Sequence, residues 1–154
     1  MRANELLAAM DTLTHGVYVI GTHTQKGENL MTAAWLCQVS MKPPTVMVAV
    51  SKGHYTAELL QEGGRFSVSV LTPAQRDVAL HCGRVSGRQK NKLEGVDVAF
   101  SEDGLPFVKG SAAHLTCELR DTFAVTDHLL FIGEVVAAKA YSEETLRYHR
   151  AKFF

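Results

Sequence analysis

A strict alternation of apolar and polar residues in the second half of the chain is the strongest constraint on its fold. Within residues 113–120 the apolar positions are Ala113, Leu115, Cys117 and Leu119. Successive side chains of a strand point to opposite faces, so this period of two predicts a strand with one buried face. Strands of parallel sheets are covered on both faces and read as unbroken apolar runs, so the alternation favours an antiparallel sheet.

Other segments rich in β-branched residues predict further strands, at 17–20, 45–50, 66–70 and 129–138. Pro43-Pro44 cannot lie inside a central strand and predicts an extended turn before Thr45. Many strands with few helices in 154 residues predict a closed or split antiparallel β-barrel, because closure removes exposed strand edges. The length predicts a single domain over residues 1–154.

A few short helices are expected between or after the strands. Thr72-Pro73-Ala74-Gln75 has the form of a capping box with proline at the first helical position, and predicts a helix through Cys82. Thr56 is expected to cap a second helix that ends at Gly63-Gly64. Ser142, followed by two glutamates, is expected to cap a last helix.

The charge balance and the cysteines exclude several classes of protein. Sixteen basic and sixteen acidic residues leave no net charge, so no nucleic-acid or anionic membrane partner is expected. The apolar run from Leu6 to Met10 is too short for a signal peptide or a membrane span. Three distant cysteines without a Cys-x-x-Cys pair predict no disulfide framework and no metal site, and favour a reducing, cytoplasmic setting.

The segment Ser51-Lys52-Gly53-His54-Tyr55-Thr56 precedes a predicted helix start. It combines hydroxyl groups, a lysine charge, a glycine that allows close backbone approach, and the free amides of the helix. A helix N-terminus beside a cation is a natural phosphate site, so Ser51, Lys52, His54 and Thr56 are candidate phosphate ligands. The alternative is a polar hairpin loop in which Lys52 is merely solvated.

Three segments together resemble the flavin reductase family of FMN-binding split-barrel proteins. Residues 27–71 contain Met-Thr-Ala-Ala, then Ser-x-x-Pro-Pro, then the small polar loop, and end in a Gly-Gly-Arg-Phe-Ser-Val-Ser-Val-Leu strand. Ser86-Gly87-Arg88 with Lys92 is similar to a basic segment of that family, and Asp127-His128 before Gly133-Glu134-Val135 is similar to its late signature. The match covers nearly the whole chain.

The resemblance implies a mostly β, split antiparallel barrel of Greek-key type, with bound FMN and with NADH or NADPH as the reductant. It implies a homodimer with FMN at the interface. It also implies that one strand runs along the flavin ring, with Met31, Thr32, Ala33 and Ala34 at its start and Val39 and Ser40 at its end. Trp35 in that segment is either a core or interface aromatic or a stacking partner.

The resemblance also implies roles for the later basic and histidine residues. Arg88 and Lys92 would grip the FMN phosphate or a nicotinamide pyrophosphate, although a solvated basic loop is the alternative. The family carries aspartate before its lysine where this chain has Asn91. His128 would lie near the flavin and the nicotinamide as the catalytic residue, or else be a surface histidine at a turn. The family carries glycine where this chain has Thr126.

The sequence analysis therefore predicts an NAD(P)H-dependent flavin reductase. No Gly-x-Gly-x-x-Gly segment is present, so the nicotinamide is expected to bind over the flavin in an open groove. An oxygenase or another electron acceptor would follow downstream. The alternatives are a flavoredoxin-like electron carrier or ferric reductase, and a barrel domain without redox use.

Overall fold

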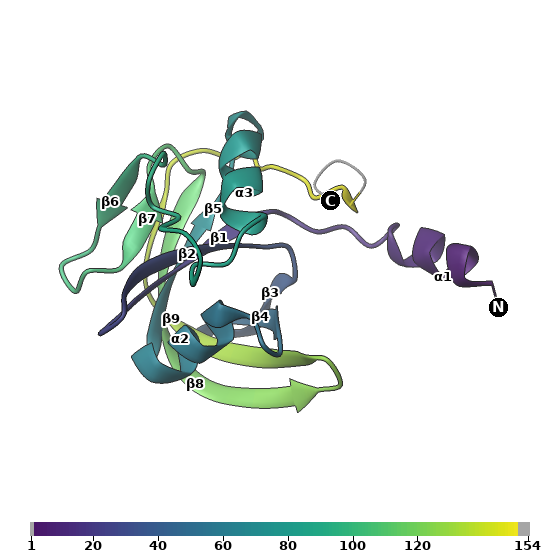
Figure 1. The fold of residues 1–154 in the computed structure, drawn as a ribbon, viewed down its shortest axis with the longest axis horizontal. Helices are drawn as coiled ribbons and strands as arrows, with labels where there is room; N and C mark the ends of the chain where they lie inside the picture. Colours follow the sequence, from purple (N-terminus) through teal and green to yellow (C-terminus); the bar gives the residue numbers. More distant parts are fainter. Residues whose placement is uncertain (1, 151–154) are drawn as a thin grey trace.

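The fold is a curled antiparallel sheet with short helices at its margins (Figure 1). A computed structural model describes residues 2–150. The helices are α1 (Ala3–Met10), α2 (Tyr55–Gly63), the 3-10 turn η1 (Pro73–Gln75) and α3 (Arg76–Gly83). The strands are β1 (Tyr18–Thr24), β2 (Gly27–Ala33), β3 (Leu36–Met41), β4 (Pro44–Ser51), β5 (Arg65–Val70), β6 (Val98–Phe100), β7 (Pro106–Val108), β8 (Ala113–Val125) and β9 (His128–Ala140). No described helix is both long enough and apolar enough to cross a membrane.

Seven strands form one sheet in the order β2-β1-β5-β8-β9-β4-β3, and each neighbouring pair is antiparallel. The remaining strands, β6 and β7, form a separate hairpin. The large sheet is not closed, because β2 and β3 are its two edges. It curls far enough for β2 to contact β4. The predicted mostly β, split antiparallel barrel with a few short helices is confirmed.

The expectation of one strand from Met31 to Ser40 is wrong. β2 ends at Ala33, which pairs with Tyr18 of β1, and β3 begins only at Leu36. Between them the chain changes partner, and the carbonyl of Trp35 accepts a hydrogen bond from the amide of Ala49 in β4. Two residues thus carry the chain from one edge of the sheet to the other.

The predicted helices around Thr56 and Thr72 are present, with small differences. α2 begins one residue before Thr56, its N-cap residue is His54, and Gly64 ends it with a φ of 70°. The Thr56 side chain is buried instead of capping the helix. The capping box at Thr72 is confirmed, because the Gln75 side chain accepts a hydrogen bond from the Thr72 amide.

The expected helix after Ser142 is wrong. Residues 142–149 form no helix, because their amides bond to distant parts of the chain. The amides of Ser142, Leu146 and Tyr148 donate to the carbonyls of Ala112, Leu71 and His15, respectively. These bonds lay the segment across the barrel and take the donors that a helix needs.

The core occupies both faces of β1. Ile20 packs inside the barrel with a buried cluster that includes Val48, Phe66 and Phe131. The neighbouring Val19 points the other way and packs in a second cluster beneath α3. β1 is therefore buried on both sides. This explains why its sequence is an unbroken apolar run without alternation of apolar and polar residues.

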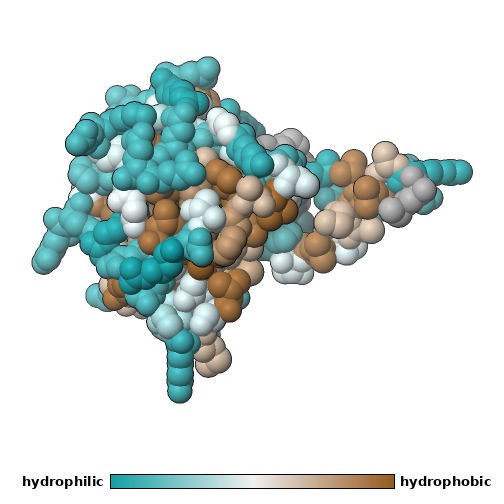
Figure 2. All heavy atoms as spheres, turned by 90° about the horizontal axis from the view of Figure 1, so that it is seen from below, coloured by the Kyte–Doolittle hydropathy of each residue, from teal (hydrophilic) through white to brown (hydrophobic). Residues whose placement is uncertain are grey.

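The opposite half of the sheet has only one buried face. On β8, β9, β4 and β3 the outward positions, identified by the strand register, form an apolar surface that we call the outer face. Its members are Trp35, Cys37, Met47, Ala49, Phe123, Val125, Leu130 and Ile132. Trp35 and Phe123 are about half exposed. Figure 2 shows hydrophobic side chains gathered on the underside of the molecule, where the β8–β9 hairpin lies in Figure 1.

Replacing Gly133 with alanine is expected to destabilise the protein. A Cβ atom there would lie 2.6 Å from Cζ of Phe66, whose side chain is fully buried. Such overpacking costs about 1–3 kcal/mol of unfolding free energy. Urea unfolding measures the change. Gly63→Ala is the control, because a Cβ atom at Gly63 would come no closer than 3.3 Å to another atom, a Thr24 methyl carbon. Equal unfolding midpoints for the two variants would contradict the prediction.

Candidate functional site

The register between β4 and β9 brings two chemically active segments together. Ser51, the last residue of β4, pairs with His128, the first residue of β9. Beyond this pair the amide of Lys52 donates to the carbonyl of Asp127 over 2.9 Å. The loop after β4 and the turn before β9 are therefore held as one unit, although more than seventy residues separate them in the chain.

The imidazole of His128 is held by polar groups at both ring nitrogens. Its Nε2 lies 3.3 Å from Oγ of Ser51, and its Nδ1 lies 2.7 Å from Oδ1 of Asp127. The ring of Trp35 lies against it, with centroids 4.8 Å apart. These contacts fix the ring while leaving it partly exposed. A histidine held in this way can donate a hydrogen bond or a proton at a defined position.

The turn before His128 keeps a left-handed conformation without glycine. Thr126 has a φ of 39°, a region that a β-branched residue rarely enters. The resemblance implied a glycine at this position, and glycine would adopt this backbone conformation without strain. The turn still delivers Asp127 and His128 to their partners.

The start of α2 is open to an anion. Its N-cap residue, His54, makes no side-chain capping bond, and within residues 2–150 no side chain is recorded on the amides of Tyr55 and Thr56. Gly53, with a φ of 88°, leaves empty space where a Cβ atom would stand. Lys52 is exposed beside it, and no described carboxylate pairs with it. A dianionic phosphate fits this set of donors.

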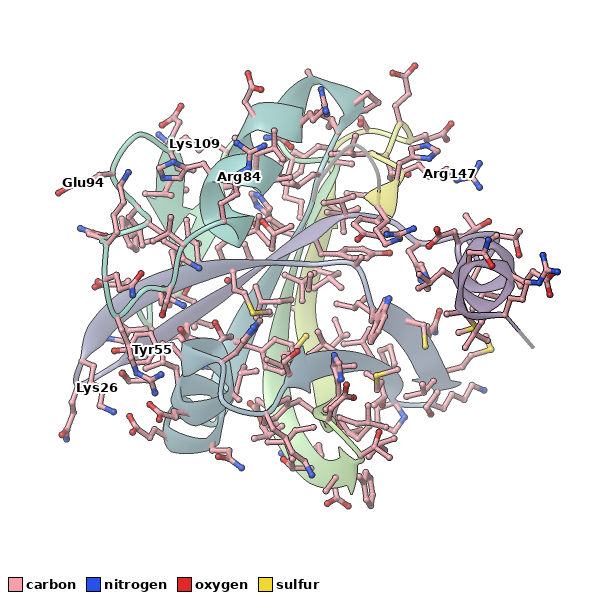
Figure 3. All side chains as sticks on the ribbon, turned by 45° about the vertical axis from the view of Figure 1, so that its right-hand side comes forward. Lys26, Tyr55, Arg84, Glu94, Lys109 and Arg147 are labelled. Carbon is pink, nitrogen blue, oxygen red and sulfur yellow. The ribbon has the colours of Figure 1, made fainter. Side chains whose placement is uncertain are left out.

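A polar groove of about 420 Å³ lies on the far side of the same helix start. It is lined by Lys26, Gly27, Glu28, Asn29, Gly87, Arg88, Gln89, Lys90, Asn91 and Leu93. The ring of Tyr55 lies between two of these cations, 5.9 Å from Nζ of Lys26 and 4.9 Å from the guanidinium carbon of Arg88. Figure 3 shows Lys26 and Tyr55 side by side at this end of α2.

Two of the three cations of the groove have acidic partners. Arg88 forms an ion pair with Glu58, and Lys26 lies 2.9 Å from Glu62. Both carboxylates belong to α2. Arg88 was predicted to bind a phosphate or pyrophosphate. In the structure Glu58 of the same chain already neutralises its charge. Lys52 differs from Lys26 and Arg88 in this respect.

Asn29 was not predicted as a site residue, and the structure gives it a central position. Its amide nitrogen donates to Oγ1 of Thr56 over 3.2 Å, which joins β2 to the first turn of α2. Gly87 approaches it so closely that a Cβ atom there would lie 2.1 Å from Asn29 Oδ1. No local pattern in the sequence marks this contact between three distant segments.

The other predicted ring contacts lie partly inside the protein and partly at its surface. Met31 and Ala33 are buried in the barrel core. The hydroxyl of Thr32 donates to the carbonyl of Ala79 over 2.6 Å and so fastens α3 to β2. Ala34 stands at the crossing next to Trp35, where its backbone is close to the outer face. Val39 and Ser40 lie on the edge strand β3.

Lys92 was expected to bind a phosphate, but its side chain is buried in the structure. Its side chain is turned inward with a relative exposure of 5%, and its Nζ donates to the carbonyl of Cys82 over 2.9 Å. Burial lowers the pKa of this ammonium group. The contact ties the loop after α3 back onto the helix. Asn91 supports the same loop, because its side chain accepts a hydrogen bond from the Leu93 amide.

Comparison with known proteins assigns the family. Residues 10–154 match the flavin reductase like domain, so the chain belongs to this family. It is 37% identical to the NADH-dependent flavin reductase StyB of Pseudomonas fluorescens, over 79% of this chain and 69% of that protein. It is 35% identical to the high molecular weight rubredoxin of Moorella thermoacetica, over 84% of this chain and 58% of that protein.

Solved structures agree with this assignment. The NADH:FAD oxidoreductase SgcE6 of Streptomyces globisporus, in complex with NAD and FAD fragments, superposes with a TM-score of 0.87 at 28% identity, over 95% of this chain and 87% of that chain. Nitrilotriacetate monooxygenase component B of Mycobacterium thermoresistibile superposes with a TM-score of 0.86 at 25% identity, over 96% and 82%. Some relatives are much longer, since the chain spans only 58% of the Moorella protein.

The contact between Asp127 and His128 is expected to control the titration of the carboxylate. The hydrogen bond from His128 lowers the pKa of Asp127, so the carboxylate form persists to lower pH in the folded protein. In His128→Phe this bond is absent, and the pKa of Asp127 should rise toward its ordinary value. Carbon-13 NMR of the labelled side-chain carboxyl measures it. The same titration midpoint in both proteins would contradict the assigned contact.

Proposed function

We propose that this protein is an NAD(P)H-dependent flavin reductase that binds FMN between the start of α2 and the outer face. The observation that carries the proposal is the joined segment of Ser51, Lys52 and His128, which sets a lysine with no described acidic partner and the first amides of α2 beside a fixed imidazole. Family membership and the relatives named as NADH-dependent reductases support it.

The phosphate end of the flavin would be held at the helix start. Lys52 supplies the charge, the amides of the first turn of α2 supply directed donors, and Ser51 and His54 border the same loop. Gly53 leaves the backbone accessible to the ligand. Thr56 would not contact the phosphate directly. Its buried hydroxyl accepts a hydrogen bond from Asn29 and so holds the start of α2 against β2.

The ring end would lie toward Trp35 and His128. β2 ends at Ala33 and Ala34 follows it, and the backbone of these two small residues can approach the polar edge of a tricyclic ring. When bound, FMN accepts the hydride that a reduced nicotinamide donates. His128 would hold a proton or hydrogen bond at that edge, with Asp127 and Ser51 fixing the orientation of its imidazole.

The nicotinamide would enter from the open side of the flavin. The chain has no separate dinucleotide motif, and the relative solved with NAD and FAD fragments shares this barrel. Stacking over the flavin would bring the hydride donor to about 3–3.5 Å from the accepting atom. We further propose that the reduced flavin serves an oxygenase partner, as the name of the monooxygenase component relative suggests.

A FMN electron carrier or ferric reductase is the second candidate function. A solved flavoredoxin of Methanosarcina acetivorans favours it, since it superposes with a TM-score of 0.76 at 32% identity, over 85% of this chain and 70% of that chain. Anaerobic addition of NADH separates the two. Bleaching of the flavin spectrum, followed by turnover of free flavin, supports the reductase. A flavin spectrum that resists NADH and NADPH supports the carrier, and a protein that takes up no FMN defeats both.

We also propose that the protein acts as a homodimer in a reducing, cytoplasmic setting. The outer face is an apolar surface on four strands that no described helix of the chain covers, and such surfaces mark protein interfaces. His128 and Ser51 lie at its margin, so a second copy on this face would border the flavin. All three cysteines are free thiols, which supports the reducing setting.

Lys52→Ala is expected to weaken FMN binding by about tenfold or more, because one charge-assisted contact to phosphate contributes about 1.5–3 kcal/mol. Fluorescence quenching of FMN measures the dissociation constant. Riboflavin, which lacks the phosphate, is the matched ligand control and should bind the variant and the parent equally. An equal loss for FMN and riboflavin would remove Lys52 from the phosphate site.

His128→Ala is expected to slow reduction of bound FMN by about 10²-fold or more, within the range of a lost acid–base group. Stopped-flow absorbance with NADH under anaerobic conditions measures this rate. FMN affinity should change little, since the phosphate donors are intact. His23→Ala is the control, because His23 is an exposed histidine outside the proposed site. A reduction rate like that of the parent for His128→Ala would show that the imidazole takes no part in the reaction.

A further inference from the structure

Helix α1 has an apolar side that its own chain does not bury. None of its residues is buried, and Figure 1 shows it projecting from the body of the molecule on the side of β3. The side chains of Leu6, Leu7, Met10 and the following Leu13 are between 46% and 55% exposed. An isolated helix of eight residues is marginal in water. α1 therefore requires an apolar surface to pack against.

The spacing of these residues forms one stripe. Ala3, Leu6, Leu7 and Met10 recur at intervals of three and four, which places them on one side of the helix. Glu5 lies on the opposite side. The helix thus has the pattern of an element with one buried side, although that side is open in the single chain.

The base of the arm is fixed to the body. The guanidinium of Arg150 donates to both carboxylate oxygens of Asp11 over 2.9–3.2 Å. Gly16 forms a β-bridge with Arg147, and the hydroxyl of Thr12 bonds back to the carbonyl of Ala9. The two terminal segments thus anchor each other, and from this anchor α1 leads away from the barrel (Figure 1).

The same chain carries a complementary surface on β3. This strand is an edge of the sheet, and Val39 and Met41 on it are 51% and 79% exposed. The strand continues directly into the outer face at Cys37. Covering an edge strand with a helix is one way in which proteins prevent uncontrolled strand pairing.

We propose that α1 of each copy packs on the β3 edge of a second copy, so that the two chains exchange arms about a two-fold axis. The apolar side of α1 and the exposed β3 edge belong to the same chain. In a two-fold dimer each α1 helix covers the β3 edge of the other copy, so neither surface stays exposed in either copy. The arm contact extends the interface proposed for the outer face. The inference rests on that dimer and does not depend on flavin reduction.

The exchange also lies beside the proposed site. His15, at the base of the arm, has its ring centroid 6.5 Å from that of Trp35, and Trp35 contacts His128. Tyr148 of the other terminal segment lies 6.5 Å from His15. A partner that holds α1 would therefore hold the segment that borders the Trp35 and His128 rings.

Directed disulfide formation between two distinguishable copies tests the exchange. One copy carries Met10→Cys and a mass tag, the other carries Met41→Cys, and both carry Cys37→Ser. Cys82 and Cys117 are buried, and burial raises the pKa of these thiols to about 11 and about 12, so they stay unreactive at pH 8. Mild oxidation of the mixed dimers should link the two copies. Glu5→Cys in place of Met10→Cys is the control on the opposite side of α1 and should link poorly.

Deletion of residues 2–10 gives a second, independent readout. The dimer dissociation constant, measured by sedimentation, should rise at least tenfold. Linkage that is absent with Met10→Cys, or equal with Glu5→Cys, overturns the exchange, as does an unchanged dissociation constant for the deletion. Anaerobic NADH reduction is assayed on the same proteins. A reductase that keeps its rate without linkage refutes only the arm exchange, whereas linkage without reduction refutes only the proposed activity.

Discussion

The pairing of β4 with β9 is the constraint on which the candidate site depends. It ends at Ser51 and His128, and one further backbone bond from Lys52 to Asp127 locks the loop to the turn. Both segments are irregular, and irregular segments are usually the most mobile parts of a fold. Here each one continues a central strand of the sheet. The proposed phosphate donors and the imidazole therefore have a fixed separation before any ligand arrives, which is the condition for orienting a reactive ring.

One half of the sheet is covered on both faces and the other half on one face only. This difference underlies the two proposed contacts with a second copy, on the outer face and on the β3 edge. β1 has core clusters on both faces, with the barrel interior on one side and α3 on the other. β8, β9, β4 and β3 have the barrel interior on one side and an open apolar surface on the other. Small domains rarely leave such a surface in water, because its hydration is unfavourable. The residues of the proposed flavin site lie along the border between the covered and the open half.

Sequence periodicity predicted most of the strands and the helices at Thr56 and Thr72, because these depend on local alternation and on local caps. It failed after Ser142, where the amides find carbonyls in distant segments and local capping signals are overruled. For the site, the loop at Ser51 and the histidine at 128 were identifiable by residue type and by resemblance to a family. Asn29 and the inward turn of Lys92 were not, since each depends on a partner that only the tertiary fold brings close. The break between Ala33 and Leu36 was also missed, because a change of strand partner leaves no periodic signal.

The ion pair of Arg88 with Glu58 has a consequence for anion binding in the groove. An anion that approaches Arg88 meets a guanidinium already occupied by a carboxylate and resting on the Tyr55 ring. Its association therefore competes with Glu58 for the charge of Arg88. Glu58 thus lowers the net charge that the groove presents next to Tyr55, so Arg88 attracts an incoming anion less strongly than an unpaired guanidinium would.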